Sequence, residues 1–305
     1  MSNVLKCIFC MKEMEKGSEE HIFPDSLGGL LVIYNVCKRC NDKLGQKVDS
    51  HLVNHQLMQF SRLTKKLKGK KGKIPNPLGR GHLQNDPETT VHYKFTDEGK
   101  PESLYVVPKV KSENGHYNVI ADASEPDRVV DMVNKFLKRN NQVTKSREEI
   151  LSSAKYVSDK NPRMQINMNF DINNYRKAIL KITYEMAYYW LGKNYLDDKM
   201  GEKIRNYILS DDLDVEGLNG YADLVDDKKN GLTSLADDNS HIAVLKKDGN
   251  KLYCYVNLFN LFHGGLVVSE QAEKYTNHED RFLINDVVKR EIRENRLEDE
   301  LLRER

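Results

Sequence analysis

The longest helical pattern of hydrophobic and polar positions runs from Asn173 to about Tyr195 and reads NNYRKAILKITYEMAYYWLGKNY. The apolar residues that recur there at helical spacing are Ile179, Ile182, Met186 and Trp190. Such a stripe, with a period near 3.6 residues, is typical of a helix that packs on a core. We therefore predict a buried helix over this segment, followed by a shorter helix in GEKIRNYILSDD.

Between residues 88 and 170 the pattern changes to short alternating runs. The segments TVHYKFT, SLYVVPKVKS, HYNVIADA and MQINMNF alternate or are rich in β-branched and aromatic residues, which favours strands joined by turns. EPDRVVDMVNKFLKRNN has an acid near its start and Lys and Arg at its end, so we predict a helix there. A second helix is predicted in SREEILSSAKYV.

The C-terminal part combines both patterns. HIAVLKKDGNKLYCYVNLFNLFHGGLVVSE predicts two or three strands, with Asp248–Gly249 as a hairpin turn. The last residues, NDVVKREIRENRLEDELLRER, are predicted to form a charged helix that is solvated or faces a partner. Residues 88–305 are therefore predicted to form one mixed α+β domain, whose function its sequence does not indicate.

The length and composition suit a globular protein. The chain has 305 residues, of which 39% are apolar and 31% are charged, which fits one large domain or two smaller ones. No apolar run approaches the ~20 residues that cross a bilayer, and the start MSNVLKCIFC has no apolar signal region. We therefore expect no membrane partner and a cytoplasmic, reducing setting, in which paired cysteines favour metal over disulfides.

The cysteines are concentrated at the N-terminus. Four of the five lie within the first 40 residues and form two pairs of equal spacing, Cys7 with Cys10 and Cys37 with Cys40. A two-residue spacer lets two thiolates converge on one tetrahedral ion, and two such pairs complete a closed site. We predict a structural Zn²⁺, with redox dithiols or unrelated thiols as the alternative. Cys254, in the apolar run KLYCYVNLF, is predicted to be a buried structural residue.

The 26 residues between the two cysteine pairs contain the stretch EEHIFPDSLGG, from Glu19 to Gly29. By itself this stretch is a turn that carries a histidine. With its surroundings, over about residues 5–55, it resembles an HNH endonuclease of the zinc-stapled kind. The residues that carry the resemblance are Cys7, Cys10, Glu20, His21, Pro24, Gly28, Gly29, Asn35, Cys37, Cys40 and Asn41.

The resemblance implies a ββα-metal module in residues 1–60, with a two-stranded ribbon and a helix that begins near Cys40. It implies that His21 is the general base, because histidine ordinarily titrates near neutral pH, and that Asn35 fixes its imidazole. Glu20 and Asn41 would bind a catalytic Mg²⁺ or Mn²⁺, since both supply the oxygen that a hard cation prefers. Asp and His are commoner at these two positions, and the Asn found here favours Mg²⁺ or Mn²⁺ over softer metals.

Positive charge gathers directly after this module. The net charge of the chain is only +2, yet RLTKKLKGKKGK, from Arg62 to Lys73, holds seven positive residues and no acid. Glycines and prolines interrupt regular structure from Gly69 on, so residues 61–87 are predicted to be a basic linker. Beside a nuclease we expect it to contact DNA phosphates, with a solvated linker as the alternative. The expected contacts are Arg62, Lys65, Lys66, Lys68, Lys70, Lys71 and Lys73.

The sequence thus predicts a metal-dependent HNH endonuclease that hydrolyses DNA phosphodiester bonds. One HNH site cuts one strand, which favours a homodimer, and the resemblance suggests restriction or anti-phage defence as a setting. By the same resemblance, residues 88–305 are expected to serve sensing, target recognition or oligomerisation. The alternatives are a non-catalytic zinc module that binds DNA or protein, an RNase, and a nuclease effector activated by a small ligand.

Overall fold

The structure is a computed structural model of the chain, and it describes residues 5–69, 72–96, 98–113, 116–168, 174–211, 222–223, 232, 235–275 and 279–303. Its contacts divide the chain into two compact units. Unit 1 comprises residues 1–75 and 170–305, and unit 2 comprises residues 76–169. This division differs from the predicted boundaries of 1–60, 61–87 and 88–305, because the C-terminal residues pack with the N-terminal ones.

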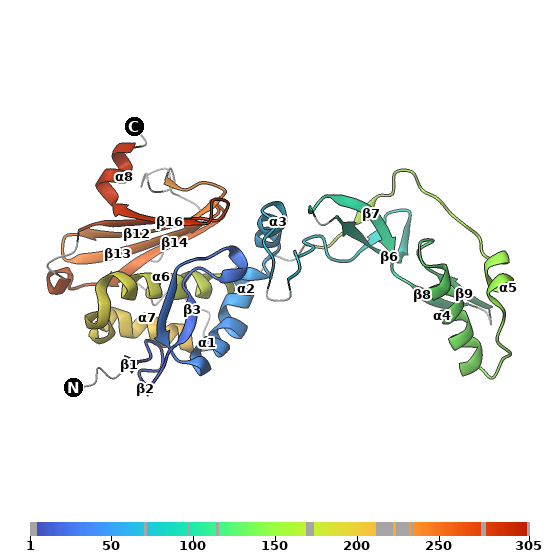
Figure 1. Ribbon diagram of the computed structural model, residues 1–305, viewed down its shortest axis with the longest axis horizontal. Coiled ribbons are helices and arrows are strands. Elements are labelled where there is room, and N and C mark those ends of the chain that lie inside the picture. The colour runs from blue at the N-terminus through green and yellow to red at the C-terminus, as the bar shows by residue number, and fades with distance from the viewer. Residues whose placement is uncertain are drawn as a thin grey trace. The chain divides into compact units, whose positions relative to one another are not determined.

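Unit 1 begins with two short antiparallel strand pairs followed by an interrupted helix (Figure 1). The elements are β1 Leu5–Lys6, β2 Glu13–Met14, β3 Ser18–His21, η1 Asp25–Leu27, β4 Val32–Val36, α1 Lys38–Leu44, η2 Gly45–Asp49, α2 Ser50–Val53 and α3 Gln56–Thr64. The order of β3, β4 and α1 confirms the ββα arrangement. The helix begins at Lys38 and is interrupted at Asn54 and His55, where a continuous helix from near Cys40 was expected.

The predicted buried helix is α6, which spans Asn174–Leu191 and continues into the 3-10 helix η3, Gly192–Asp197. Ile179, Ile182 and Met186 are fully buried along it. The helix contacts η2 and α2 of the N-terminal segment and also the sheet described below. The N-terminal segment therefore has no core of its own among the described residues, since one hydrophobic cluster includes its apolar side chains together with those of α6 and the sheet.

The sheet of unit 1 has six antiparallel strands in the order β11-β14-β13-β12-β15-β16. The strands and the remaining helices of unit 1 are α7 Lys199–Leu209, β11 Ala222–Asp223, β12 Ser240–Asp248, β13 Lys251–Leu258, β14 Phe262–Ser269, η6 Ala272–Tyr275, β15 Arg281–Asp286, β16 Glu291–Arg296 and α8 Leu297–Arg303. The strands predicted over residues 241–270 are confirmed. Their first turn directly follows Asp248, with Gly249 in the left-handed region at a φ of 58°.

The helix predicted over residues 285–305 is wrong for its first half. There β15 and β16 form a hairpin, paired from Arg281 with Arg296 to Asp286 with Glu291, and only α8 is helical. Nearly every residue of β16 is exposed, because it is an edge strand that carries charges on both faces. Such a strand has the same composition as a solvated helix, so the sequence pattern alone does not separate the two.

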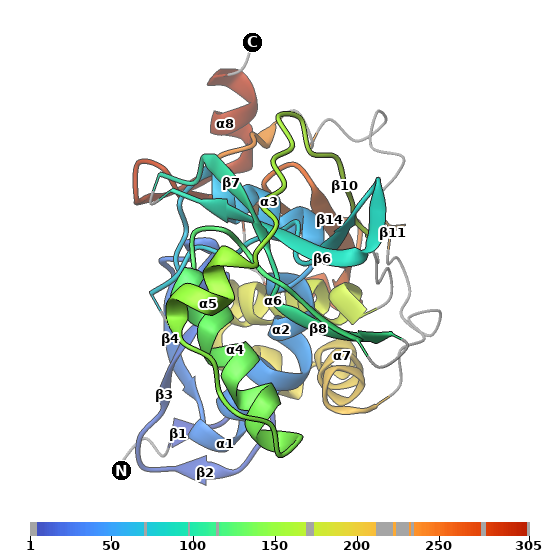
Figure 2. The same cartoon turned by 90° about the vertical axis from the view of Figure 1, so that its right-hand side faces the viewer.

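Unit 2 consists of a four-stranded sheet in the order β10-β5-β6-β7, a β8–β9 hairpin and the helices α4 and α5, which lie side by side (Figure 2). The elements are β5 Gly81–Leu83, β6 Asp86–Phe95, β7 Pro101–Val106, β8 Lys109–Glu113, β9 His116–Ile120, α4 Pro126–Arg139, α5 Arg147–Ser152 and β10 Met164–Gln165. The predicted strands and helices are present, although α5 and β10 are shorter than expected. Asn169 and Phe170 of the expected strand lie outside the described residues.

The mixture of helices and antiparallel sheets confirms the α+β class. Among the helices that the structure describes, none is both long and apolar enough to cross a bilayer.

Candidate metal centre and active site

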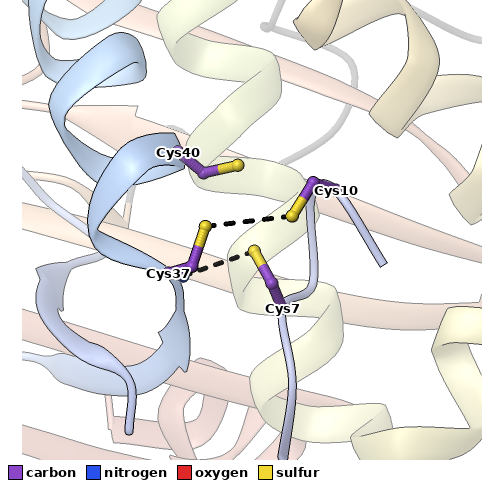
Figure 3. Close-up of side chains that lie close together, drawn as sticks. All are labelled: Cys7, Cys10, Cys37 and Cys40. Carbon is purple, nitrogen blue, oxygen red and sulfur yellow. Dashed lines mark hydrogen bonds between the residues drawn. The ribbon is translucent and has the colours of Figure 1, made fainter. Parts of the chain in front are cut away.

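The four N-terminal cysteines converge at one point (Figure 3). Cys7 and Cys10 come from the turn after β1, and Cys37 and Cys40 lie at the start of α1. Their sulfur atoms all lie within 4.8 Å of one another, and Sγ of Cys10 is 3.8 Å from Sγ of Cys37. Four thiolates at about 2.3 Å from a central Zn²⁺ stand about 3.8 Å apart in an ideal tetrahedron. The donor set therefore fits a tetrahedral zinc ion that fastens β1 to α1.

The pKa shifts of these thiols indicate that a metal ion would displace protons from the cysteines when it binds. Burial raises the pKa of Cys7 and of Cys40. Burial also acts to raise the pKa of Cys37, but hydrogen bonds from Cys40 and the other cysteines outweigh it and lower that pKa. Since a metal-bound cysteine is a thiolate, zinc must displace the protons of the buried thiols, and its affinity falls as the pH falls.

The strand β3 carries the acid–histidine pair and directs its side chains to opposite faces. Glu20 is 4% exposed, whereas the side chains of Glu19 and His21 are 60% and 24% exposed. Nε2 of His21 lies 3.7 Å from Oε1 of Glu19. Because side chains alternate along a strand, fixing Glu20 inward directs His21 to the outer face of the hairpin.

The carboxylate of Glu20 lies in a buried cluster of charges. Nζ of Lys181 lies 2.6 Å from Oε1 of Glu20, 3.1 Å from Oδ2 of Asp49 and 3.4 Å from Oε2 of Glu185. Lys181 and Glu185 are completely buried, and they belong to α6, while Asp49 ends η2. One ammonium thus faces three carboxylates contributed by three different elements.

The pKa values and the hydrogen bonds of these side chains reflect the excess of carboxylates over ammonium groups. Burial raises the pKa of Glu20 and raises that of Glu185 well above its usual range, against the attraction of Lys181. Burial alone would lower the pKa of Lys181, yet the three carboxylates raise it. Within the part of the chain that the structure describes, Oδ1 of Asp49 and both oxygens of Glu185 are buried without a hydrogen-bond partner. The cluster is therefore short of positive charge.

Asn41 fastens the helix α1 to the strand β3. Its Nδ2 donates to the backbone oxygen of Glu19 at 2.7 Å and to Oγ of Ser18 at 3.2 Å. The amide oxygen of the same side chain stays available as an acceptor. The structure thus brings Asn41 next to Glu19, and Glu19 directly precedes Glu20, the other expected ligand of the catalytic cation.

Asn35 lies in β4, the strand that pairs with β3. Its backbone oxygen accepts from the amide of Ile8 at 2.9 Å, and the residue lines a surface pocket of about 370 Å³ beside Tyr188 and Lys193. His21 pairs with Val32, but the register of the two strands shifts between Ser18 and Glu20, where two residues of β4, Tyr34 and Asn35, lie opposite Glu19. The role of Asn35 beside the imidazole therefore stays a prediction, and its backbone bond to Ile8 joins the hairpin to the turn that carries Cys7 and Cys10.

The loop between β3 and β4 is held by residues of the C-terminal sheet. Nε2 of His241 lies 2.9 Å from the backbone oxygen of Leu27. Asn285 accepts from the amide of Leu30 at 2.8 Å and donates to the backbone oxygen of Gly28 at 3.1 Å. A Cβ at Gly28, which has a φ of 83°, would lie 2.5 Å from Val287. The glycine is therefore required by both conformation and packing.

The basic segment is only partly available to a nucleic acid. Arg62 is 4% exposed, so the expected contact of this residue with phosphate is corrected: its guanidinium lies inside unit 1, 3.5 Å from the backbone oxygen of Val53. Lys65 lies 4.7 Å above the ring of Phe259, and burial lowers its pKa. Lys66, Lys68 and Lys73 are exposed, while Lys70 and Lys71 lie outside the described residues.

Sequence reasoning missed Asp49, Lys181 and Glu185. A signal existed for the last two, because Lys181 and Glu185, four residues apart, interrupt the mostly apolar run 178–187 of the predicted helix. Charges at core positions of a buried helix are unusual unless they are paired. Nothing in the sequence, however, indicated that their partner is Glu20.

Comparison with known proteins agrees with the geometry of the N-terminal segment. Residues 7–57 match the family model described as HNH endonuclease. Searches of curated proteins and of solved structures give no match. The matched segment contains the four cysteines, β3, β4 and the helices α1 and α2, so the family likeness and the metal centre coincide in one part of unit 1.

Proposed function

We propose that this protein is a metal-dependent HNH endonuclease that hydrolyses DNA phosphodiester bonds. The observation that carries the proposal is the family match of residues 7–57, in a segment whose four cysteines are positioned to bind a metal. A nuclease function in general follows from the family. We further propose that the substrate is DNA and that individual residues of this segment have the following roles.

His21 is proposed as the general base that removes a proton from the attacking water. Its position at the end of β3 supports this role, because Glu20 points inward and the imidazole faces outward, where a phosphate can approach. Glu20 and Asn41 are proposed to hold a divalent cation through carboxylate and amide oxygens, which suit Mg²⁺ or Mn²⁺. When bound, such a cation supplies charge stabilisation at the phosphate and at the leaving oxygen.

The donor chemistry around Glu20 fits a hard cation. Lys181 contacts Oε1 of Glu20, and a carboxylate has a second oxygen to offer. Asn41 uses its amide nitrogen towards β3, which leaves its oxygen as a ligand atom. The buried carboxylates outnumber the one ammonium beside them, so a nearby cation would relieve their surplus of negative charge.

The proposed contacts with DNA are Lys66, Lys68 and Lys73, which are exposed in the basic segment. Lysines beside the site would neutralise phosphates and guide the backbone without reading sequence. Because one HNH site cuts one strand, we also propose that double-strand cleavage uses two copies of the chain or two successive nicks. A cytoplasmic role in restriction or anti-phage defence extends the proposal to its biological setting.

The experiment that tests the function is plasmid nicking by zinc-loaded protein with Mg²⁺ or Mn²⁺. We expect His21→Ala to lower the nicking rate by about 10²- to 10⁴-fold, the usual contribution of a general base. The matched control is His51→Ala, since His51 is an exposed histidine of the same segment and should keep the rate within about twofold.

The nuclease proposal fails if folded, zinc-loaded wild-type protein cleaves none of a panel of substrates. The N-terminal segment would then be a zinc module that binds DNA or protein without catalysis. The panel includes double-stranded, single-stranded and branched DNA and RNA, so that cleavage of RNA alone would replace DNA as the substrate. Equal activity of wild type and His21→Ala would remove His21 from the mechanism.

A further inference from the structure

Lys181 is a completely buried charge near the proposed active site. It is 0% exposed, and it lies on α6, 161 positions along the chain from Glu20, which it contacts at 2.6 Å. Its other two partners, Asp49 and Glu185, come from η2 and from the next turn of α6. The lysine is thus the point at which the N-terminal hairpin, its helix and the central helix of unit 1 meet.

Fold stability alone does not account for this cluster. A buried ion pair offers little stability over apolar side chains of similar volume, and the surroundings on α6 are apolar, with Ala178 and Ile182 fully buried. A purely structural pair would also be balanced, with one acid for one lysine. Here three acids face one lysine, and among the described residues Oδ1 of Asp49 and both carboxylate oxygens of Glu185 have no hydrogen-bond partner.

Through Glu20, the buried cluster around Lys181 also affects a residue outside the core. Glu20 directly precedes His21 in β3, so the inward anchor of one side chain fixes the outward direction of the next. The lysine also takes only Oε1 of Glu20 and leaves the other carboxylate oxygen to a further partner. A single contact therefore fixes the pose of a proposed ligand and of the proposed base.

We propose that Lys181 is a positioning residue of the nuclease site: it holds the Glu20 carboxylate in the orientation that binds the divalent cation and thereby also sets the direction of His21. The inference rests on the proposed function, and it assigns part of the site to the C-terminal region of the chain. Residues 174–191 then belong to the nuclease, although they lie outside the segment that matches the family.

The two roles that Lys181 could have predict opposite changes in metal binding. If the lysine only balanced charge, its removal alone would leave the carboxylates more negative and strengthen the binding of Mn²⁺, and its removal together with Glu185 would leave that binding unchanged. If it positions Glu20, its removal weakens the binding of Mn²⁺, and partners that orient metal ligands typically contribute about 10- to 100-fold in affinity.

The test uses the full-length, zinc-loaded protein and measures Mn²⁺ binding by electron paramagnetic resonance of the free ion. Lys181→Met alone leaves Glu185 buried without its partner, so the principal variant is Lys181→Met with Glu185→Met, which replaces the pair on α6 by two apolar side chains. Lys181→Arg is the conservative variant. The control is Lys177→Met, another buried lysine of α6, which donates to the backbone oxygen of Ser210 at 2.7 Å.

We expect the double variant to keep its zinc and its cooperative unfolding, while its Mn²⁺ affinity falls about 10- to 100-fold. At saturating Mn²⁺, kcat for nicking should fall and KM for DNA should stay within about twofold. Lys181→Arg should recover part of the Mn²⁺ affinity, and Lys177→Met should bind Mn²⁺ as the wild type does.

Unchanged or stronger Mn²⁺ binding in the folded double variant overturns the positioning role. The positioning role is also overturned if the wild type does not bind Mn²⁺, or if it binds Mn²⁺ and Glu20→Gln does not weaken that binding. A wild type that binds Mn²⁺ through Glu20 but cuts no nucleic acid overturns the proposed function alone, because the comparison of Mn²⁺ affinities still decides the role of Lys181.

Discussion

The two units of the chain have interiors of different kinds. In unit 1 the N-terminal segment, α6 and the six-stranded sheet share one large hydrophobic cluster. In the described part of unit 2 the buried hydrophobic residues are Val91, Tyr105 and Ile150. Unit 2 therefore depends on sheet pairing and partly exposed polar contacts, whereas unit 1 depends on burial.

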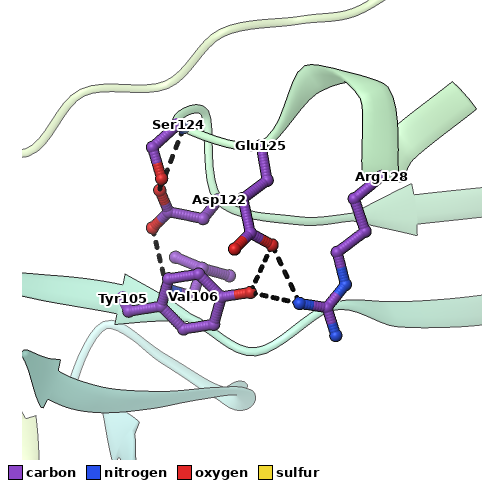
Figure 4. A network of polar contacts seen from close by, with 6 residues as sticks. All are labelled: Tyr105, Val106, Asp122, Ser124, Glu125 and Arg128. Carbon is purple, nitrogen blue, oxygen red and sulfur yellow. Dashed lines mark hydrogen bonds and ion pairs between the residues drawn. The ribbon is translucent and has the colours of Figure 1, made fainter.

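The contacts of the two units also span different distances along the chain. In unit 1 the hydrogen bonds from Tyr184 to Ile8 and between His241 and Leu27 join residues 176 and 214 positions apart. In unit 2 the network in Figure 4 joins Tyr105 to Glu125 and Arg128, which are 20 and 23 positions away. The candidate site thus belongs to the unit that is assembled from distant segments.

This difference teaches that residues 7–57, which match the HNH endonuclease model, do not form an autonomous module in this protein. His241 and Asn285 contact the loop between β3 and β4. Lys181 contacts Glu20, and Tyr184 donates to Ile8 in the turn that carries Cys7 and Cys10. Small zinc modules usually rely on the metal for their fold. In this protein a metal bound by the four cysteines would act together with the long-range packing. Perturbing one unit at a time distinguishes the two units.

Removal of zinc should produce the largest difference between the units. We expect Cys7→Ser to lose zinc and to destabilise the N-terminal segment by about 5 kcal/mol or more, because structural zinc contributes about 10–16 kcal/mol in small zinc-finger peptides and part of the packing remains here. Hydrogen exchange followed by mass spectrometry should show lost protection in residues 5–64 and unchanged protection in residues 76–168.

The control for this experiment is Cys254→Ser, the same chemical change at a buried cysteine outside the metal centre. That variant should keep its zinc and should cost only the packing of one side chain in β13. An equal loss of protection in unit 2 after zinc removal would show that the two units unfold as one.

The pH dependence of unit 1 should be the next largest effect. Burial lowers the pKa of His241 to about 4. As the pH falls from 7 to 5, the unfolded chain takes up a proton at this residue and the folded protein does not, so the free energy of unfolding falls by about 2 kcal/mol. His241→Gln should remove this part of the pH dependence, as measured by urea unfolding at the two pH values.

Trp190 makes the measurement specific to unit 1, since it is the one tryptophan of the chain and lies on α6. The control is His92→Gln in unit 2, where burial also lowers the pKa of the histidine. Because His92 belongs to the other unit, its replacement should leave the pH dependence of the Trp190 transition unchanged. A change as large as that of His241→Gln would contradict the separation of the two units.

The sequence predicted those parts of the structure that depend on local patterns. The helix over residues 173–195 and the strands over residues 241–270 follow from apolar periodicity, and the four-cysteine cluster follows from spacing. The hairpin of β15 and β16 did not follow, because charges alternate with apolar residues too weakly there to distinguish an edge strand from a solvated helix. Pairing with β15 decides the structure, and pairing is a long-range property.

The candidate site was less predictable than the fold, for a related reason. Arg62 was grouped with its charged neighbours, yet it lies one helical turn after the buried Met58 and on the same face of α3. Glu20 was recognised next to His21, but its partner Lys181 lies in another segment. Local spacing identifies groups that are capable of the chemistry, whereas their burial and partners depend on how distant segments pack.

The smallest effect compares one tyrosine hydroxyl in each unit. The hydroxyl of Tyr184 donates to the backbone oxygen of Ile8 at 2.7 Å in a fully buried place, so Tyr184→Phe leaves a buried acceptor without its donor and should cost about 1.5 kcal/mol. The hydroxyl of Tyr105 donates to Glu125 at 2.7 Å. Glu125 keeps its ion pair with Arg128 and is reached by water, so Tyr105→Phe should cost about 0.5 kcal/mol.

Hydrogen exchange measured separately for peptides of each unit resolves the two costs in the intact protein, because each variant should lower protection only in its own unit. Tyr184→Phe should also lower protection around Ile8, next to Cys7 of the four-cysteine cluster, whereas Tyr105→Phe should leave the turn that carries Cys7 and Cys10 unchanged. Equal costs for the two variants would mean that the hydroxyl in unit 2 is as well shielded from water as the one in unit 1. The proposed contrast between a buried and a partly solvated interior would then be wrong.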